Sequence, residues 1–165
     1  MRLLRFLTLL VLTVWVGGLA VLGAVAAPAI FDVLGGLDPA GGRDTAGLVF
    51  GTVFAHFQWL AWALAVLLIG LMGTRAALGP RPRRFAWRMW AIVAMLAMSL
   101  TTGLYIAPRI DAIRADVDGP VAALPDADAR KAAFGQLHGA SNGLMVVTLL
   151  AGVWLIWVET RDDHR

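Results

Sequence analysis

The last long apolar run of the chain opens with Lys131-Ala-Ala-Phe-Gly-Gln-Leu-His-Gly-Ala-Ser-Asn-Gly-Leu-Met145. Its glycines recur every fourth residue, at Gly135, Gly139 and Gly143. On a helix they form one flat stripe along which another helix can approach closely. His138 and Asn142 are one turn apart and lie beside this stripe. Polar groups within a membrane normally face a bundle interior, so we expect a transmembrane helix with a polar packing face.

The composition of the chain is that of an integral membrane protein. Of its 165 residues, 59% are hydrophobic and 15% are charged, whereas about 25% are charged in soluble domains. The absence of cysteine excludes disulfides, thiolate metal sites and cysteine nucleophiles. The net charge of +3 does not indicate nucleic-acid binding, because the arginines lie between apolar runs, where membrane topology accounts for them.

Four apolar runs are long enough to cross a bilayer as helices, which takes about 20 residues. They are Phe6–Phe31, Ala46–Met72, Phe85–Ala107 and Phe134–Val158. The only charged residue inside them is Arg88, near the start of the third run. The alternation typical of membrane β-strands is not seen. The sequence therefore predicts an all-α membrane protein, a single domain (residues 1–165) built as a bundle of four transmembrane helices.

Basic residues are distributed unequally between the two ends of the expected helices. Nine of the 14 lie before the first run, around the connection of the second and third, or after the fourth. The opposite side has five, together with eight of the 11 acidic residues. The positive-inside rule then places both termini in the cytoplasm, and we expect a multi-pass protein of a bacterial inner membrane. The first run exceeds the roughly 7–15 residues of a signal-peptide core, so we expect an uncleaved helix; cleavage at Ala24-Val-Ala26, which resembles a signal-peptidase site, is the alternative.

The connection between the third and fourth runs, residues 109–131, is amphipathic. Its apolar residues recur at helical spacing, so we expect an interfacial helix that continues past Pro108, or restarts there, and ends near Gly119-Pro120.

A short internal repeat relates the two halves of the chain. Ala27-Pro28-Ala29-Ile30 ends the first run, and Ala107-Pro108-Arg109-Ile110 ends the third, 80 residues later. The pattern predicts two tandem helical hairpins in the same orientation, with chance similarity between apolar helices as the alternative.

Two histidines in the outer half of the expected bundle, His56 and His138, are candidate cofactor ligands. Imidazoles on facing helices of a four-helix bundle can hold a haem b iron from both sides or contribute to a copper site. For either histidine taken alone, we expect instead a hydrogen bond inside the bundle.

Further polar and small residues gather at the outer ends of the runs. Ser141 and Asn142 belong to the same helix as His138. Asp32 follows the first run and Arg109 the third, so an ion pair between them would join the two hairpins; separate solvation is the alternative. Gly47 and Gly51 in the second run form a small-xxx-small pair that indicates close helix contact.

Motifs of enzymes and ion pumps are absent from the sequence. No phosphate loop, serine triad or zinc-protease motif is present. No acidic residue or lysine falls inside an apolar run, which argues against a pump built on an intramembrane carboxylate. We therefore expect a non-enzymatic protein.

Three motifs at the outer ends carry a family resemblance. They are Ala46-Gly-Leu-Val-Phe50, Pro108-Arg109 and Arg130-Lys-Ala-Ala-Phe-Gly-Gln-Leu-His-Gly-Ala-Ser-Asn142. Together they resemble the transmembrane protein 205 family and its bacterial members of unknown function. The last motif is similar to the pattern Phe-x-x-x-His-Gly-x-Ser of that family. The resemblance implies a four-helix membrane protein and hints at metal or drug handling. A looser likeness to copper-resistance D-type membrane proteins rests on architecture and the paired histidines.

Three functions are thus considered. The first is a non-enzymatic membrane protein whose outer polar cluster packs the bundle and binds a small ligand. The second is a haem- or copper-binding redox or transport protein that uses His56 and His138. The third is a subunit that docks a second copy or another membrane protein through the glycine stripe.

Overall fold

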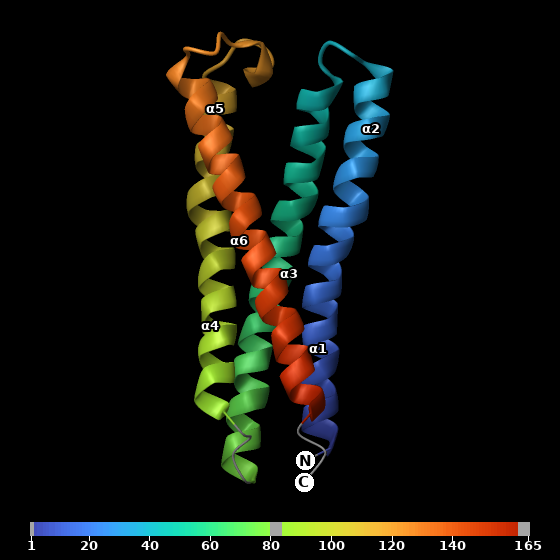
Figure 1. Ribbon diagram of the computed structural model, residues 1–165, viewed down its shortest axis with the longest axis vertical. Coiled ribbons are helices and arrows are strands. Elements are labelled where there is room, and N and C mark those ends of the chain that lie inside the picture. The colour runs from blue at the N-terminus through green and yellow to red at the C-terminus, as the bar shows by residue number, and fades with distance from the viewer. Residues whose placement is uncertain (1, 80–83, 162–165) are drawn as a thin grey trace.

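The computed structural model describes residues 2–79 and 84–161, and within them the chain is helical apart from short connections and contains no strand. Figure 1 shows long helical rods that run side by side. Four rods are long and apolar enough to cross a membrane. The predicted all-α, four-helix membrane bundle is therefore confirmed.

Two of the rods are composed of three consecutive elements, and the other two are single helices. In chain order the elements are α1 (Arg2–Val21), η1 (Leu22–Ala26), α2 (Ala27–Leu37), α3 (Gly42–Leu78), α4 (Phe85–Thr101), η2 (Thr102–Ile106), α5 (Ala107–Ala115), η3 (Val121–Ala123) and α6 (Ala129–Thr160). The rods extend past the apolar runs, since a helix continues in the interface where side chains and caps satisfy its ends. The expected interfacial helix is observed only as α5, which ends before Gly119.

The first and third rods each contain one π-helical turn, at η1 and η2. In both turns the following alanine donates to the carbonyl five residues earlier: Ala27 to Leu22, and Ala107 to Thr102. Pro28 or Pro108 comes next, and a proline ring crowds the preceding turn and lacks an N–H donor. The two turns lie 80 residues apart, as the Ala-Pro motifs do. The backbone therefore repeats as α1-η1-α2-α3 and α4-η2-α5-α6, which agrees with two tandem hairpins.

The four rods pack so that α1 and α4 each contact α3 and α6. Consequently α3 and α6 lie diagonally across the bundle. We call the end where α1 begins and α6 ends the terminal end, and the opposite end the distal end. Towards the distal end, the pair of α2 and α3 diverges from the pair of α5 and α6 (Figure 1).

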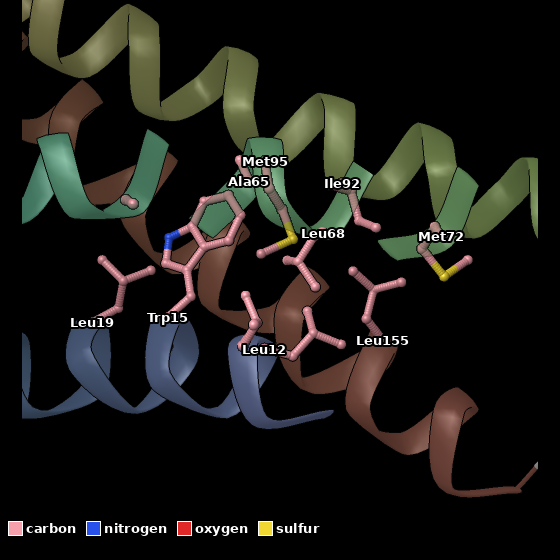
Figure 2. Close-up of a cluster of buried hydrophobic side chains, with 11 residues drawn as sticks. Leu12, Trp15, Leu19, Ala65, Leu68, Met72, Ile92, Met95 and Leu155 are labelled. Atoms are coloured by element: carbon pink, nitrogen blue, oxygen red, sulfur yellow. The ribbon is translucent and has the colours of Figure 1, made fainter. Parts of the chain in front are cut away.

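The hydrophobic core fills the half of the bundle nearer the terminal end. Trp15, Leu68 and Met95 are at most 1% exposed, and Figure 2 shows them converging from α1, α3 and α4. Ala61 and Ala65 are fully buried, and such small residues let α3 approach its neighbours closely. The bundle is therefore tightly packed where its ends meet and more open where the hairpins diverge.

Candidate functional site

A cluster of buried charges lies at the terminal end of the bundle. Glu159, near the end of α6, is 2% exposed. Its carboxylate accepts hydrogen bonds from Arg88 of α4 at 2.5 Å and from Arg75 of α3. Arg5 of α1 donates to the carbonyl oxygens of Glu159 at 2.7 Å and of Thr160 at 3.1 Å. The last turn of α6 is thus bonded to all three other rods.

This cluster adds to one expectation drawn from the sequence and corrects another. The arginines of the terminal end were expected to be topological signals at helix ends, and two of them are also buried ion-pair partners: Arg88 is 1% exposed and Arg75 12%. No acidic residue was expected within the bundle, yet Glu159 is buried in the last turn of α6. Buried charges are costly unless they are paired and hydrogen-bonded, and here one carboxylate satisfies arginines from two helices.

A signal for Glu159 does exist in the sequence. It is the only glutamate of the chain. It also continues the buried face of α6, where Thr148, Gly152 and Leu155 precede it at spacings of four, three and four residues. A charged residue that continues a core-facing stripe indicates a buried partner on a neighbouring helix.

A second polar network joins α3 and α4 in the middle of the bundle. The Ser99 hydroxyl donates to Gln58 Oε1 at 2.7 Å, and Gln58 Nε2 donates to the Ser99 carbonyl at 3.2 Å. Trp62 Nε1 donates to the same hydroxyl at 3.1 Å. Gly103 lies directly against the Trp62 ring, where a Cβ would come within 2.8 Å of it. The closed set of bonds holds the two helices in register.

A cavity of about 10 Å³ adjoins this network. Gln58, Ser99, Thr102 and Thr148 give it polar walls, and Trp15 helps to close it. This volume corresponds to roughly one water molecule. It is therefore too small for an organic cofactor.

The two candidate histidines are placed on different sides of the bundle. His56 is exposed on α3, and its Nδ1 lies 2.8 Å from the carbonyl oxygen of Thr52, one turn earlier. His138 is exposed on α6, and its ring stacks parallel to Phe134 with centroids 6.1 Å apart. Because both rings are exposed, on two helices that lie diagonally, the structure does not bring the two imidazoles together inside the bundle. Neither ring reaches into the core.

The remaining members of the expected outer cluster are also dispersed. Arg109 lies over the ring of Tyr105, with its guanidinium carbon 3.3 Å from the centroid. Across residues 2–79 and 84–161, no ion pair joins Arg109 to Asp32, which is exposed on α2. Ser141 is half-buried, while Asn142 is exposed. The expected link between the hairpins through Asp32 and Arg109 is thus not observed.

The glycines of the α6 stripe face away from the rest of the chain. Gly135, Gly139 and Gly143 are exposed, and a Cβ added to any of them would meet no atom within 4 Å. Gly51 is similarly open, whereas Gly47 lies against the guanidinium of Arg114. The α6 stripe is therefore a free surface, and Gly47 is a place of close contact between α3 and α5.

Ion pairs fix the distal connection to the first turn of α6. Asp128 caps that turn by accepting from the Arg130 N–H at 2.8 Å, and it also binds the Arg130 guanidinium. Hydrogen bonds from Arg130 lower the pKa of the Asp128 carboxyl. A hydrogen bond from Lys131 likewise lowers the pKa of Asp126. These contacts are solvated, so they order the connection more than they stabilise the bundle.

Comparison with known proteins gives one informative match. A model of the family described as "Domain of unknown function (DUF4149)" matches residues 10–118. The matched stretch includes most of α1 and runs through α5, and it stops before α6. No curated protein and no solved structure matches the chain.

Proposed function

The chain belongs to the DUF4149 family, and from this premise we propose that it is a non-enzymatic membrane subunit that docks a transmembrane helix of a partner on the distal half of α6. The docking surface consists of the glycine stripe (Gly135, Gly139 and Gly143) with His138 and Asn142 beside it. We further propose that the protein resides in a bacterial inner membrane with its terminal end in the cytoplasm. The excess of arginine at that end supports this orientation.

The observation that carries the proposal is a change of composition along one exposed face of α6. In the terminal half this face bears bulky apolar side chains: Val146, Leu150, Val153 and Trp157, each about half exposed or more. Such a surface suits lipid. In the distal half the same face bears glycines, which expose the helix backbone and allow another helix to approach.

The polar side chains beside the stripe strengthen the argument. His138 and Asn142 are exposed, and within the described residues neither side chain forms a hydrogen bond. Lipid tails cannot satisfy an imidazole or an amide, so such groups in a membrane normally face protein or water. A partner helix with donors and acceptors at the matching depth would satisfy both.

Site-specific cross-linking tests this surface cleanly, because the chain has no native cysteine. We expect Asn142→Cys, alkylated with a thiol-reactive photo-cross-linker and irradiated, to form a discrete cross-linked product in native membranes. Leu150→Cys, on the lipid-like part of the same helix and treated in the same way, should form none. Adding Gly139→Leu should abolish the Asn142→Cys product, because the side chain would fill the stripe.

Gly70→Leu is the matched control for that second substitution. Gly70 is also an exposed helical glycine with no atom within 4 Å of an added Cβ, but it lies on α3. Gly70→Leu should therefore leave the Asn142→Cys product intact. Equal cross-linking at Asn142 and Leu150, or a product that survives Gly139→Leu, would contradict the proposal. A product of twice the mass of the chain would identify a second copy as the partner.

The haem or copper alternative requires the imidazoles of His56 and His138 to come from two copies or from a rearranged bundle. The paired histidines of the sequence, on which the looser likeness to copper-resistance D-type membrane proteins rests, are the reason to test it. Absorption spectra of the oxidised and reduced protein, with metal analysis, are the measurement. A Soret band that is lost in His138→Ala would favour this alternative over docking.

A further inference from the structure

An open pocket lies at the distal end, between the start of α3 and the end of α5. Its volume is about 630 Å³, within the roughly 300–1,000 Å³ range of small-molecule sites. Asp44 and Leu48 of α3 line one side, and Asp111 and Arg114 of α5 line the other. Neither the histidines nor the glycine stripe contributes to it.

The charged groups of this pocket are not neutralised by one another. In the part of the chain that the structure describes, the carboxylates of Asp44 and Asp111 form no hydrogen bond or ion pair. Arg114 forms none either, and its Nε is buried without a hydrogen-bond partner among those residues. The guanidinium lies against Gly47 and over the ring of Phe134, with its carbon 5.5 Å from the ring centroid. The pocket therefore offers two solvent-accessible carboxylates and a guanidinium with one buried, unsatisfied N–H donor.

We propose that this pocket binds a zwitterion that carries an ammonium and a phosphate group, supplied by a phosphatidylethanolamine headgroup. An ammonium placed between Asp44 and Asp111 would have two carboxylate acceptors. A phosphate at Arg114 would accept charge-assisted hydrogen bonds from a guanidinium, whose planar donors suit phosphate oxygens. A lipid whose headgroup carries only negative charge would be repelled by the two carboxylates and attracted by only one guanidinium, so its binding is disfavoured.

The position of the pocket favours a lipid over a soluble zwitterion. Asp44 precedes the apolar run that begins at Ala46, so the charged groups lie where the membrane interface is expected. Leu48, one turn further along α3, is 50% exposed and lines the same pocket. Val117 adds a second apolar wall. A headgroup bound among the charges could therefore extend its acyl chains along α3.

Native mass spectrometry of the full chain in detergent, titrated with phosphatidylethanolamine or phosphatidylglycerol, tests the proposal. We expect phosphatidylethanolamine to bind at least about tenfold more tightly than phosphatidylglycerol, since a hydrogen bond to a charged group is worth about this factor. Asp111→Asn and Arg114→Gln should each weaken the phosphatidylethanolamine complex by about tenfold or more.

Matched controls are Asp32→Asn and Arg43→Gln, which alter exposed distal charges that do not line the pocket. Both should bind phosphatidylethanolamine as the unaltered chain does. Free phosphoethanolamine serves as a competitor: weak competition supports the lipid, and equal competition assigns the same site to a soluble zwitterion. Because Asp111 is exposed and has no partner in the described chain, its variant should fold normally. Unchanged binding by Asp111→Asn, or equal affinity for the two lipids, would overturn the proposal.

Discussion

Arg88 of α4 donates a hydrogen bond to Glu159 of α6 across 2.5 Å, and the two side chains are only 1% and 2% exposed. The two residues are 71 positions apart in sequence. An ion pair buried this deeply gains little over a well-packed apolar pair, but it strongly disfavours any arrangement that separates the charges. Since Arg75 binds the same carboxylate, Glu159 selects which rods meet at the terminal end.

Glu159→Gln should therefore destabilise the bundle markedly. The substitution preserves the shape of the side chain but leaves the buried guanidinium of Arg88 without its carboxylate. We expect the free energy of unfolding to fall by roughly 3–5 kcal/mol, the cost typical of breaking one side of a buried pair. Unfolding of the detergent-solubilised protein, followed by circular dichroism, measures it. The control is Asp116→Asn, which removes an exposed partner of Arg130 and should lower the free energy of unfolding by less than about 1 kcal/mol. A comparable loss of stability in both variants would contradict the assigned role of Glu159.

The four spans could be predicted because the hydrocarbon core requires about 20 apolar residues in each of them. Pro28 and Pro108 occupy equivalent positions of the internal repeat, which indicates a similar distortion of two helices. The π-helical turns η1 and η2 do lie just before these prolines. The apolar runs do not predict how far each helix extends beyond the bilayer. The start of α3 at Gly42 and the extension of α6 to Thr160 depend on polar and interfacial contacts instead.

The buried charges could not be predicted from hydropathy, because an arginine at the end of an apolar run is equally compatible with solvent and with the core. Arg75 and Arg88 become buried only when α6 brings Glu159 between them. His56 shows the opposite outcome, because it was expected inside the bundle and is exposed. Helical periodicity tells which residues share a face of α3, but it does not tell which face meets a neighbour. In the structure α3 buries the face that carries Ala61 and Ala65, and His56 is exposed.

Glycine substitutions should separate the core-facing and free faces of α6. At Gly152, an added Cβ would collide with Val16 of α1 and come within 3.2 Å of Met95 Cε. We expect Gly152→Ala to lower the free energy of unfolding by about 1–3 kcal/mol, as overpacked cores do. At Gly139 the Cβ meets nothing within 4 Å, so Gly139→Ala should be neutral or stabilise the helix by up to about 1 kcal/mol. Thermal unfolding of the two variants makes the comparison, and a greater loss for Gly139→Ala would show that the helix faces are assigned wrongly.

Ser99→Ala should weaken the contact between α3 and α4. The variant removes the acceptor of Trp62 Nε1 and the donor to Gln58 Oε1 at once. Interhelical hydrogen bonds in membranes average about 0.6 and reach about 1.7 kcal/mol, and we expect a loss near the upper value. A double-mutant cycle with Gln58→Leu isolates the coupling. Thr101→Ala is the control, since that exposed hydroxyl donates to the carbonyl of Ala97 in its own helix. Purely additive effects of the Ser99 and Gln58 variants would mean that the hydrogen bond from the Ser99 hydroxyl to Gln58 Oε1 contributes nothing to stability.

Reporter fusions should show both ends of the chain on the cytoplasmic side. Arg5 donates to the carbonyls of Glu159 and Thr160, so α1 begins where α6 ends, and the positive-inside rule places this arginine-rich end in the cytoplasm. We expect a reporter fused to either terminus to be active only in the cytoplasm, and one inserted at Gly119, in the exposed distal connection, to be active only outside. Complete reversal would leave the bundle intact and make the arginines of the terminal end ion-pair partners without a topological role. Termini on opposite sides could not be reconciled with the contact between Arg5 and Glu159.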